Sequence, residues 1–81
     1  MTWQTLPPDI RAIAEAQLTK KQLHVWLLHL NGIGVRRSAV MLTVTPTTIR
    51  DHLDAAHRTL RKHGVSRQAD GSYQHERKDA E

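Results

Sequence analysis

The sequence contains no cysteine and no long hydrophobic run. Without cysteine, its 81 residues cannot form disulfide bonds, zinc–thiolate sites or thiol nucleophiles. The longest uninterrupted apolar stretch, from Val25 to Leu28, is too short to span a bilayer. Residues 1–6 also lack the basic region and apolar core of a secretory signal. We therefore expect a cytoplasmic protein with no membrane contact.

Signals of catalysis and of metal binding are also scarce. The sequence has no glycine-rich phosphate loop, and no hydroxyl side chain has an identifiable base and orienting acid beside it. The six histidines do not provide the i, i+4 pair of a helical zinc site, because His24/His29 and His52/His57 are five residues apart. We expect no enzymatic activity, no metal and no cofactor.

Positive charge is concentrated in the middle of the chain. Residues 19–63 contain eight lysines and arginines against two aspartates, a net charge of +6, whereas residues 1–18 and 64–81 each carry −1. A basic centre on a small domain favours a polyanionic partner, and nucleic acid is the first candidate.

Capping residues and helical spacing predict four helices. The first begins at Pro7-Pro8-Asp9, where prolines and an acid suit a first turn. The second has the capping-box sequence Thr19 to Gln22 and ends at Asn31-Gly32. The third runs from Val35 to about Leu42. The fourth begins at Thr45-Pro46 and ends near Gly64.

Each expected helix carries an apolar stripe that we expect to form the core. The stripes consist of Ile10, Ile13, Ala14 and Leu18; Leu23, Trp26, Leu27 and Leu30; Val35, Ala39 and Leu42; and Ile49, Leu53, Ala56 and Leu60. Trp3 either packs across this bundle or covers an interface. The predicted fold is all-α, a small four-helix domain over residues 1–64. Residues 65–81 show no helical or alternating pattern, so we expect a polar, mobile tail with Tyr73 as its only large apolar group.

The last two predicted helices have the character of a helix-turn-helix, in which a tight turn leads to a longer, basic second helix. Ala39 provides the small side chain needed where the helices cross. We expect Val44 to close the turn from inside, with Ile49 and Leu53 seating the second helix.

Residues 18–61 resemble the helix-turn-helix shared by region four of sigma factors and LuxR-type output domains. The positions that carry the resemblance read Leu18-Thr19, Val25 to Leu30, Gly32, Val35, Ala39, Leu42, Val44, Thr45-Pro46 and Thr48-Ile49. His52 is similar to a histidine of LuxR-type recognition helices. Ala56 and the run Arg58 to Arg61 look more like the end of the sigma-factor motif. The resemblance therefore leaves both families open.

The sequence departs from this pattern at several positions. Thr43 stands where the families favour glycine, which predicts a tighter or strained turn. Ser38 replaces an aliphatic core residue, a loss of buried methylenes worth roughly 1–2 kcal/mol. Val40 and Met41 occupy positions that are usually charged and exposed. Either the third helix is rotated to bury one of them, or they form an apolar contact patch for a partner.

The resemblance implies that the start of the last helix enters the DNA major groove. The expected base-contacting residues are Thr47, Thr48, Arg50, Asp51 and Asp54, with the fork of Arg50 suited to guanine. The expected phosphate-contacting residues are Lys20, Lys21, Arg36, Arg37, Arg58 and Arg61. The two acids would repel phosphates unless they pair locally, as Asp54 can with Arg50 or Arg58 at i, i+4.

The sequence thus predicts a small transcriptional regulator of bacterial or phage type that binds double-stranded DNA. Because one such domain contacts a half-site, we expect a homodimer or a partner protein. The resemblance also implies that the protein does not start transcription unaided. The alternative is a protein-interaction module that keeps this fold and binds RNA polymerase or another protein instead of reading DNA. The exposed acids and the Val40-Met41 pair favour the alternative, whereas the basic centre favours DNA.

Overall fold

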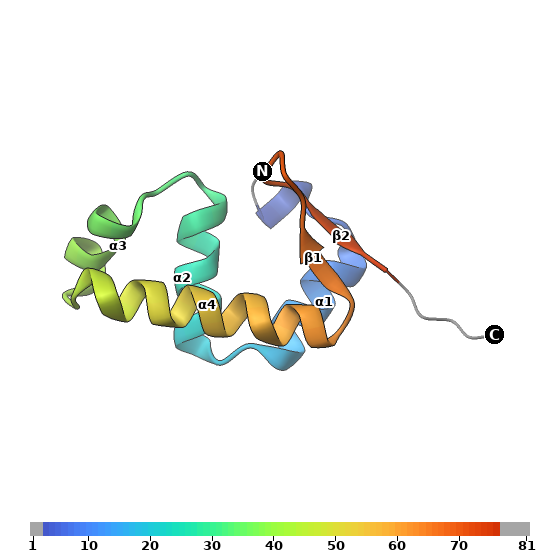
Figure 1. Ribbon diagram of the computed structural model, residues 1–81, viewed down its shortest axis with the longest axis horizontal. Coiled ribbons are helices and arrows are strands. Elements are labelled where there is room, and N and C mark those ends of the chain that lie inside the picture. The colour runs from blue at the N-terminus through green and yellow to red at the C-terminus, as the bar shows by residue number, and fades with distance from the viewer. Residues whose placement is uncertain (1–2, 77–81) are drawn as a thin grey trace.

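The computed structural model describes residues 3–76 and is mostly helical, with a small antiparallel hairpin (Figure 1). In chain order the elements are the 3-10 helix η1 (Trp3–Thr5), α1 (Pro8–Gln17), α2 (Lys20–Leu30), α3 (Val35–Leu42), α4 (Pro46–Lys62), β1 (Val65–Arg67) and β2 (Tyr73–His75). The four predicted helices are therefore confirmed. None of the helices within residues 3–76 is long and apolar enough to cross a membrane.

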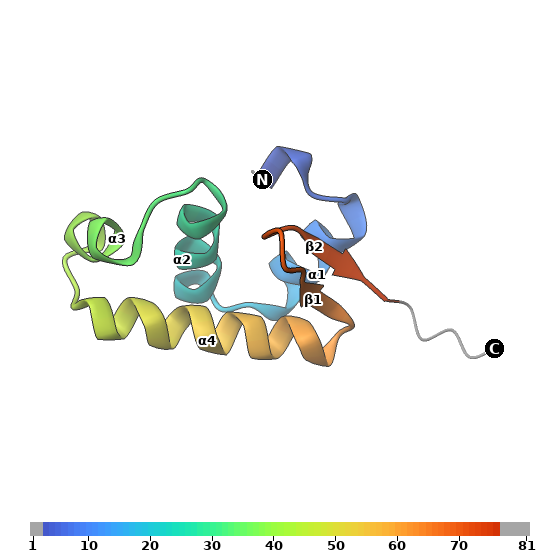
Figure 2. The same cartoon turned by 45° about the horizontal axis from the view of Figure 1, so that its top comes forward.

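Helix α4 is the longest element and organises the rest. Helix α2 packs across its middle, α3 lies beside its N-terminal end, and α1 and the hairpin lie at its C-terminal end (Figures 1 and 2). The two ends of α4 are thus supported by different parts of the chain.

Local hydrogen bonds explain where the helices begin. The hydroxyl of Thr19 accepts from the backbone N–H of Gln22, whose side chain in turn accepts from the N–H of Thr19, so the predicted capping box is confirmed. At the start of α4 the Thr45 hydroxyl accepts from the N–H of Thr48, with Pro46 in the first helical position.

The core contains most of the predicted apolar stripes. Trp26, Ile10, Ile49 and Leu60 are among its largest fully buried side chains. The ring of Trp3 packs edge-on against Trp26 with centroids 6.4 Å apart, which confirms that it packs within the protein.

The prediction of a structureless tail without strands is wrong for residues 65–76. Strands β1 and β2 pair in register, with Val65 opposite His75, and both Val65 and Tyr73 are buried in the core. A five-residue loop joins them, and its Asp70 carboxylate accepts from the N–H and hydroxyl of Ser72. Residues 77–81 of the predicted tail lie outside the described residues.

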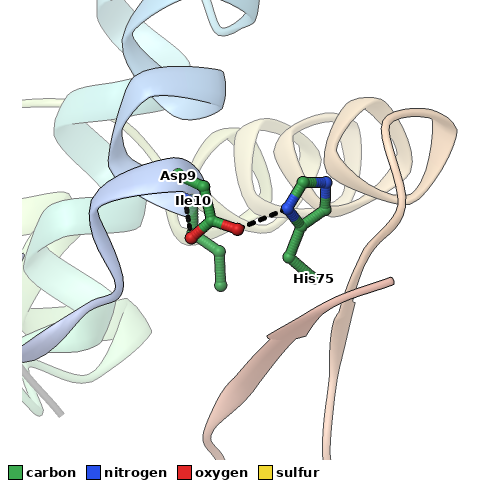
Figure 3. Close-up of polar contacts among 3 residues, drawn as sticks. All are labelled: Asp9, Ile10 and His75. Atoms are coloured by element: carbon green, nitrogen blue, oxygen red, sulfur yellow. Dashed lines mark hydrogen bonds and ion pairs between the residues drawn. The ribbon is translucent and has the colours of Figure 1, made fainter. Parts of the chain in front are cut away.

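Tyr73 and His75 of β2 fasten this hairpin to the helices through three polar contacts. The indole N–H of Trp26 donates to the Tyr73 hydroxyl at 3.0 Å, and Nε2 of His57 lies 2.8 Å from the same oxygen. At the other end of the same strand, β2, Nδ1 of His75 is 2.6 Å from the carboxylate of Asp9 in the first turn of α1 (Figure 3). Each contact joins residues that are distant in the sequence.

Helix α3 decides between the two alternatives left open for Val40 and Met41. Its buried side chains are Ser38 and Ala39, whereas Val40 is 81 % exposed and Met41 is 53 % exposed. The alternative in which α3 rotates to bury Val40 or Met41 is therefore wrong. Ser38 does take the core position predicted for it.

The turn after α3 is closed by the backbone. Thr43 adopts the left-handed conformation (φ 56°), its N–H donates to the carbonyl of Val40, and the N–H of Val44 donates to that of Ala39. The Val44 side chain is 39 % exposed. The prediction that Val44 closes the turn from inside is wrong.

Candidate nucleic-acid interface

One face of α4 is exposed along its length. Ile49, Leu53, Ala56 and Leu60 form the buried stripe. The exposed side chains opposite include Thr47, Arg50, Asp51, Asp54, Arg58 and Arg61. Arg50 and Arg61 are eleven residues, or about three turns, apart and therefore lie on the same side of the helix. Four of the five predicted base-contacting residues are thus exposed on α4.

Thr48 is the exception among those five residues. Its side chain is half-buried, and its hydroxyl lies 2.9 Å from the Thr45 hydroxyl. Its N–H donates to the same oxygen. Thr48 therefore helps to cap α4, and Thr47 offers the free hydroxyl at this end of the helix.

Basic side chains from two other helices flank the first turn of α4. Lys21 of α2 borders a shallow depression together with Thr48 and His52. Arg36 of α3 borders a second depression, with Thr45 on its wall. These two predicted phosphate contacts are therefore brought beside the N-terminal end of α4.

The remaining predicted phosphate contacts fall into two groups. Lys20 and Arg37 are exposed in the first turns of α2 and α3. Arg58 and Arg61 border an open hollow at the C-terminal end of α4, which they share with Arg67 of β1. Arg67 was not predicted to belong to a site, because the sequence analysis assigned it to the tail.

The exposed acids of α4 are not neutralised by local ion pairs. Within residues 3–76 the one ion pair joins Asp9 to His75, so Asp54 pairs with neither Arg50 nor Arg58. The side chains of Arg50, Asp51 and Asp54 are consequently available to an external partner.

Burial and nearby positive charges lower the pKa values of the two histidines near Tyr73, where the hairpin meets α4. Burial lowers the pKa of His57, with further lowering from the positive charges of His29, Arg67 and Arg61. Burial, followed by the charge of Arg67, also lowers the pKa of His29. A neutral His57 can accept a hydrogen bond from the Tyr73 hydroxyl, which itself accepts from Trp26.

Burial raises the pKa of Tyr73, so its hydroxyl keeps its proton well into the alkaline range. Asp9 behaves in the opposite way, because its hydrogen bond with His75 holds the pKa of the carboxyl below its ordinary value. These groups fix the hairpin, and His57 and Tyr73 also border the open hollow at the C-terminal end of α4.

Neither metal chemistry nor known relatives provide a further guide. Over residues 3–76, no three histidine or acidic side chains gather where they could hold a metal ion. Comparisons with protein-family models, with curated proteins and with solved structures found no match. The function is therefore inferred from the geometry and charge of the chain itself.

Proposed function

We propose that the protein is a small sequence-specific DNA-binding regulator in which α3 and α4 act as a helix-turn-helix. The observation that carries this proposal is the exposed face of α4, where Thr47, Arg50, Asp51 and Asp54 lie unpaired opposite the buried stripe. A helix with one face seated in the core and polar side chains on the other has the form needed to enter the major groove.

The side chains on this face suit the readout of bases. The guanidinium of Arg50 can donate two hydrogen bonds to O6 and N7 of guanine, and Asp51 or Asp54 can accept from N4 of cytosine. Insertion of the N-terminal half of α4 would bring Lys21 and Arg36 towards the flanking phosphates, since both lie beside its first turn. We expect two copies, or one copy and a partner protein, to occupy a full site.

An Arg50→Ala variant tests this proposal. Loss of a bidentate contact to guanine costs about 1–3 kcal/mol at the preferred site and relaxes the base preference at one position. Arg37→Ala is the matched control, because loss of a phosphate contact weakens binding to all sequences about equally. Competition binding with the preferred duplex and its single-base variants separates the two effects. Unchanged affinity and preference in Arg50→Ala would refute the assigned role of Arg50.

A second candidate function is docking on a protein, with RNA polymerase as the partner suggested by the sigma-factor resemblance. The observation that favours it is the exposure of Val40, Met41 and Val44 on one end of the molecule. Replacing Val40 and Met41 with serine should then abolish binding to purified polymerase while leaving any DNA affinity unchanged. Polymerase binding that survives both substitutions would exclude this patch as the contact.

A further inference from the structure

The hollow at the C-terminal end of α4 brings together basic residues from two parts of the chain. Arg58 and Arg61 come from successive turns of α4, and Arg67 comes from β1 after the chain reverses at Gly64. Ser66 borders the same hollow and adds a hydroxyl group. Figure 1 shows β1 beside the C-terminal end of α4, with β2 on its far side.

These positive charges are not balanced inside the protein. Asp54 is the one carboxylate among the residues that border the hollow, and it forms no ion pair with Arg58 or Arg61. The field of Arg67 also extends to the imidazoles of His29 and His57, where it contributes to lowering both pKa values. Several guanidinium groups without a counter-charge favour an anion supplied from outside.

We propose that this hollow binds a phosphate group, held by Arg67 and Ser66 of the hairpin together with Arg58 and Arg61 of α4. Planar guanidinium groups bind phosphate oxygens through pairs of parallel hydrogen bonds, and a hydroxyl donor can satisfy a further oxygen. The hairpin therefore contributes to ligand binding as well as to the core.

The position of the hollow fits a phosphate of the DNA backbone. This choice of ligand rests on the proposed function. Arg50 and Arg61 are separated by about 16 Å along the helix axis. The major groove is about 12 Å wide. If α4 crosses the groove with Arg50 at the bases, this distance places the hollow beyond the edge of the groove, where the backbone runs. A phosphate on a small ligand has the same chemistry and is the other source that the experiment distinguishes.

The first test is a titration of the full chain with inorganic phosphate at constant ionic strength, followed by NMR. We expect saturable shifts at Ser66, at Arg67 and at the His57 ring. The pKa of His57 should rise on binding, because the anion offsets the charges of Arg61 and Arg67. His29 and Asp54 are the other charged or titratable groups whose fields act on His57, and both remain in the variants.

An Arg67→Gln variant should weaken phosphate binding about tenfold, as expected for the loss of a charge-assisted hydrogen bond. Lys62→Gln is the matched control, because Lys62 is exposed beside Arg61 but does not border the hollow. It removes the same charge and should change phosphate affinity by less than about twofold. Because Arg67 is exposed, the Arg67→Gln variant should remain folded, and a thermal melt checks this directly.

The second test uses duplex DNA over a series of salt concentrations. If the phosphate belongs to DNA, Arg67→Gln should reduce the salt slope by about one and retain the base preference. If the protein binds phosphate through Arg67 but does not bind DNA, the phosphate site stands as a site for a small ligand. The proposed function would then be refuted. Sequence-specific DNA binding with equal behaviour of Arg67→Gln and Lys62→Gln would overturn the phosphate site and leave the proposed function standing.

Discussion

At the scale of single residues, two of the positions with left-handed backbone have opposite consequences. Gly64 joins α4 to β1 at φ +84°, and a Cβ atom built there would lie 2.5 Å from the carbonyl oxygen of Glu76. Its own carbonyl accepts from the N–H of Glu76 at 2.7 Å. Thr43 takes a similar conformation between α3 and α4 but carries a β-branched side chain. Glycine is required at the first position and missing at the second.

We predict that Gly64→Ala destabilises the protein more than Gly32→Ala does. Both residues have positive φ, which costs a substituted side chain about 1–2 kcal/mol. A Cβ at Gly32 has no atom within 4 Å, whereas the one at Gly64 meets backbone. The clash should add about 1–3 kcal/mol to the loss at Gly64. Urea unfolding of both variants measures the difference, and equal losses would contradict the close approach.

We predict that Thr43→Gly, in contrast, stabilises the protein. Relief of the left-handed conformation is worth about 1–2 kcal/mol, and the larger backbone entropy of glycine offsets about half of it. The net gain in the free energy of unfolding should be about 0.5–1 kcal/mol. Thr47→Gly, within the first turn of α4, is the control and should lower stability. A destabilised Thr43→Gly variant would show that the threonine side chain makes a contribution larger than the strain.

At the scale of elements, the hairpin is joined to the helices by a polar contact that depends on pH. Tyr73 of β2 lies between Trp26 of α2 and His57 of α4, and the rings of His57 and His29 are 6.0 Å apart. Protonation of either histidine would place a charge in a partly buried position near Arg67. The contact is therefore strongest when both imidazoles are neutral.

Stability should fall as the pH is lowered from neutrality. His29 and His57 have folded-state pKa values below the ordinary 6.5, so the unfolded chain binds protons first. Their contribution is fully present above pH 6.5 and is lost as the pH falls towards the folded-state pKa values. Urea unfolding at pH 7.5, about 6.5 and about 5.5 tests this, and His57→Gln should reduce the dependence. Stability that is constant or increases over this range would contradict the assignment.

The helices could be predicted from the sequence because their signals are local. The Thr19 and Thr45 caps and the apolar stripe of α4 each depend on residues within a few turns of one another. The hairpin was missed because each strand has three residues, too few to establish an alternating pattern. The Asp70-Gly71 pair between those strands was the available signal, since Asp-Gly is typical of hairpin turns.

The candidate site could be predicted in part for the same reason. The exposure of Arg50 and Asp54 follows from the periodicity of α4. The convergence of Arg67 with Arg61 depends on the reversal of the chain at Gly64 and on the burial of Tyr73, which are tertiary features. The exposure of Val44 is also a tertiary feature, which its residue type does not reveal.

At the scale of the whole molecule, positive charge is distributed around α4. Lys21 and Arg36 lie beside its N-terminal end, and Arg58, Arg61 and Arg67 border the hollow at its C-terminal end. Phosphate contacts at both ends would orient the helix on the duplex while the side chains between them read the bases. DNA binding should therefore have both a salt-dependent and a sequence-dependent contribution.

The most direct test is binding to a random pool of duplex DNA over a series of salt concentrations, with sequencing of the bound fraction. The account predicts enrichment of one motif and an affinity that falls steeply with salt, with a slope that reports the number of phosphate contacts. Weak binding at low salt without enrichment of any motif would contradict the assignment of α4 as a DNA-reading helix.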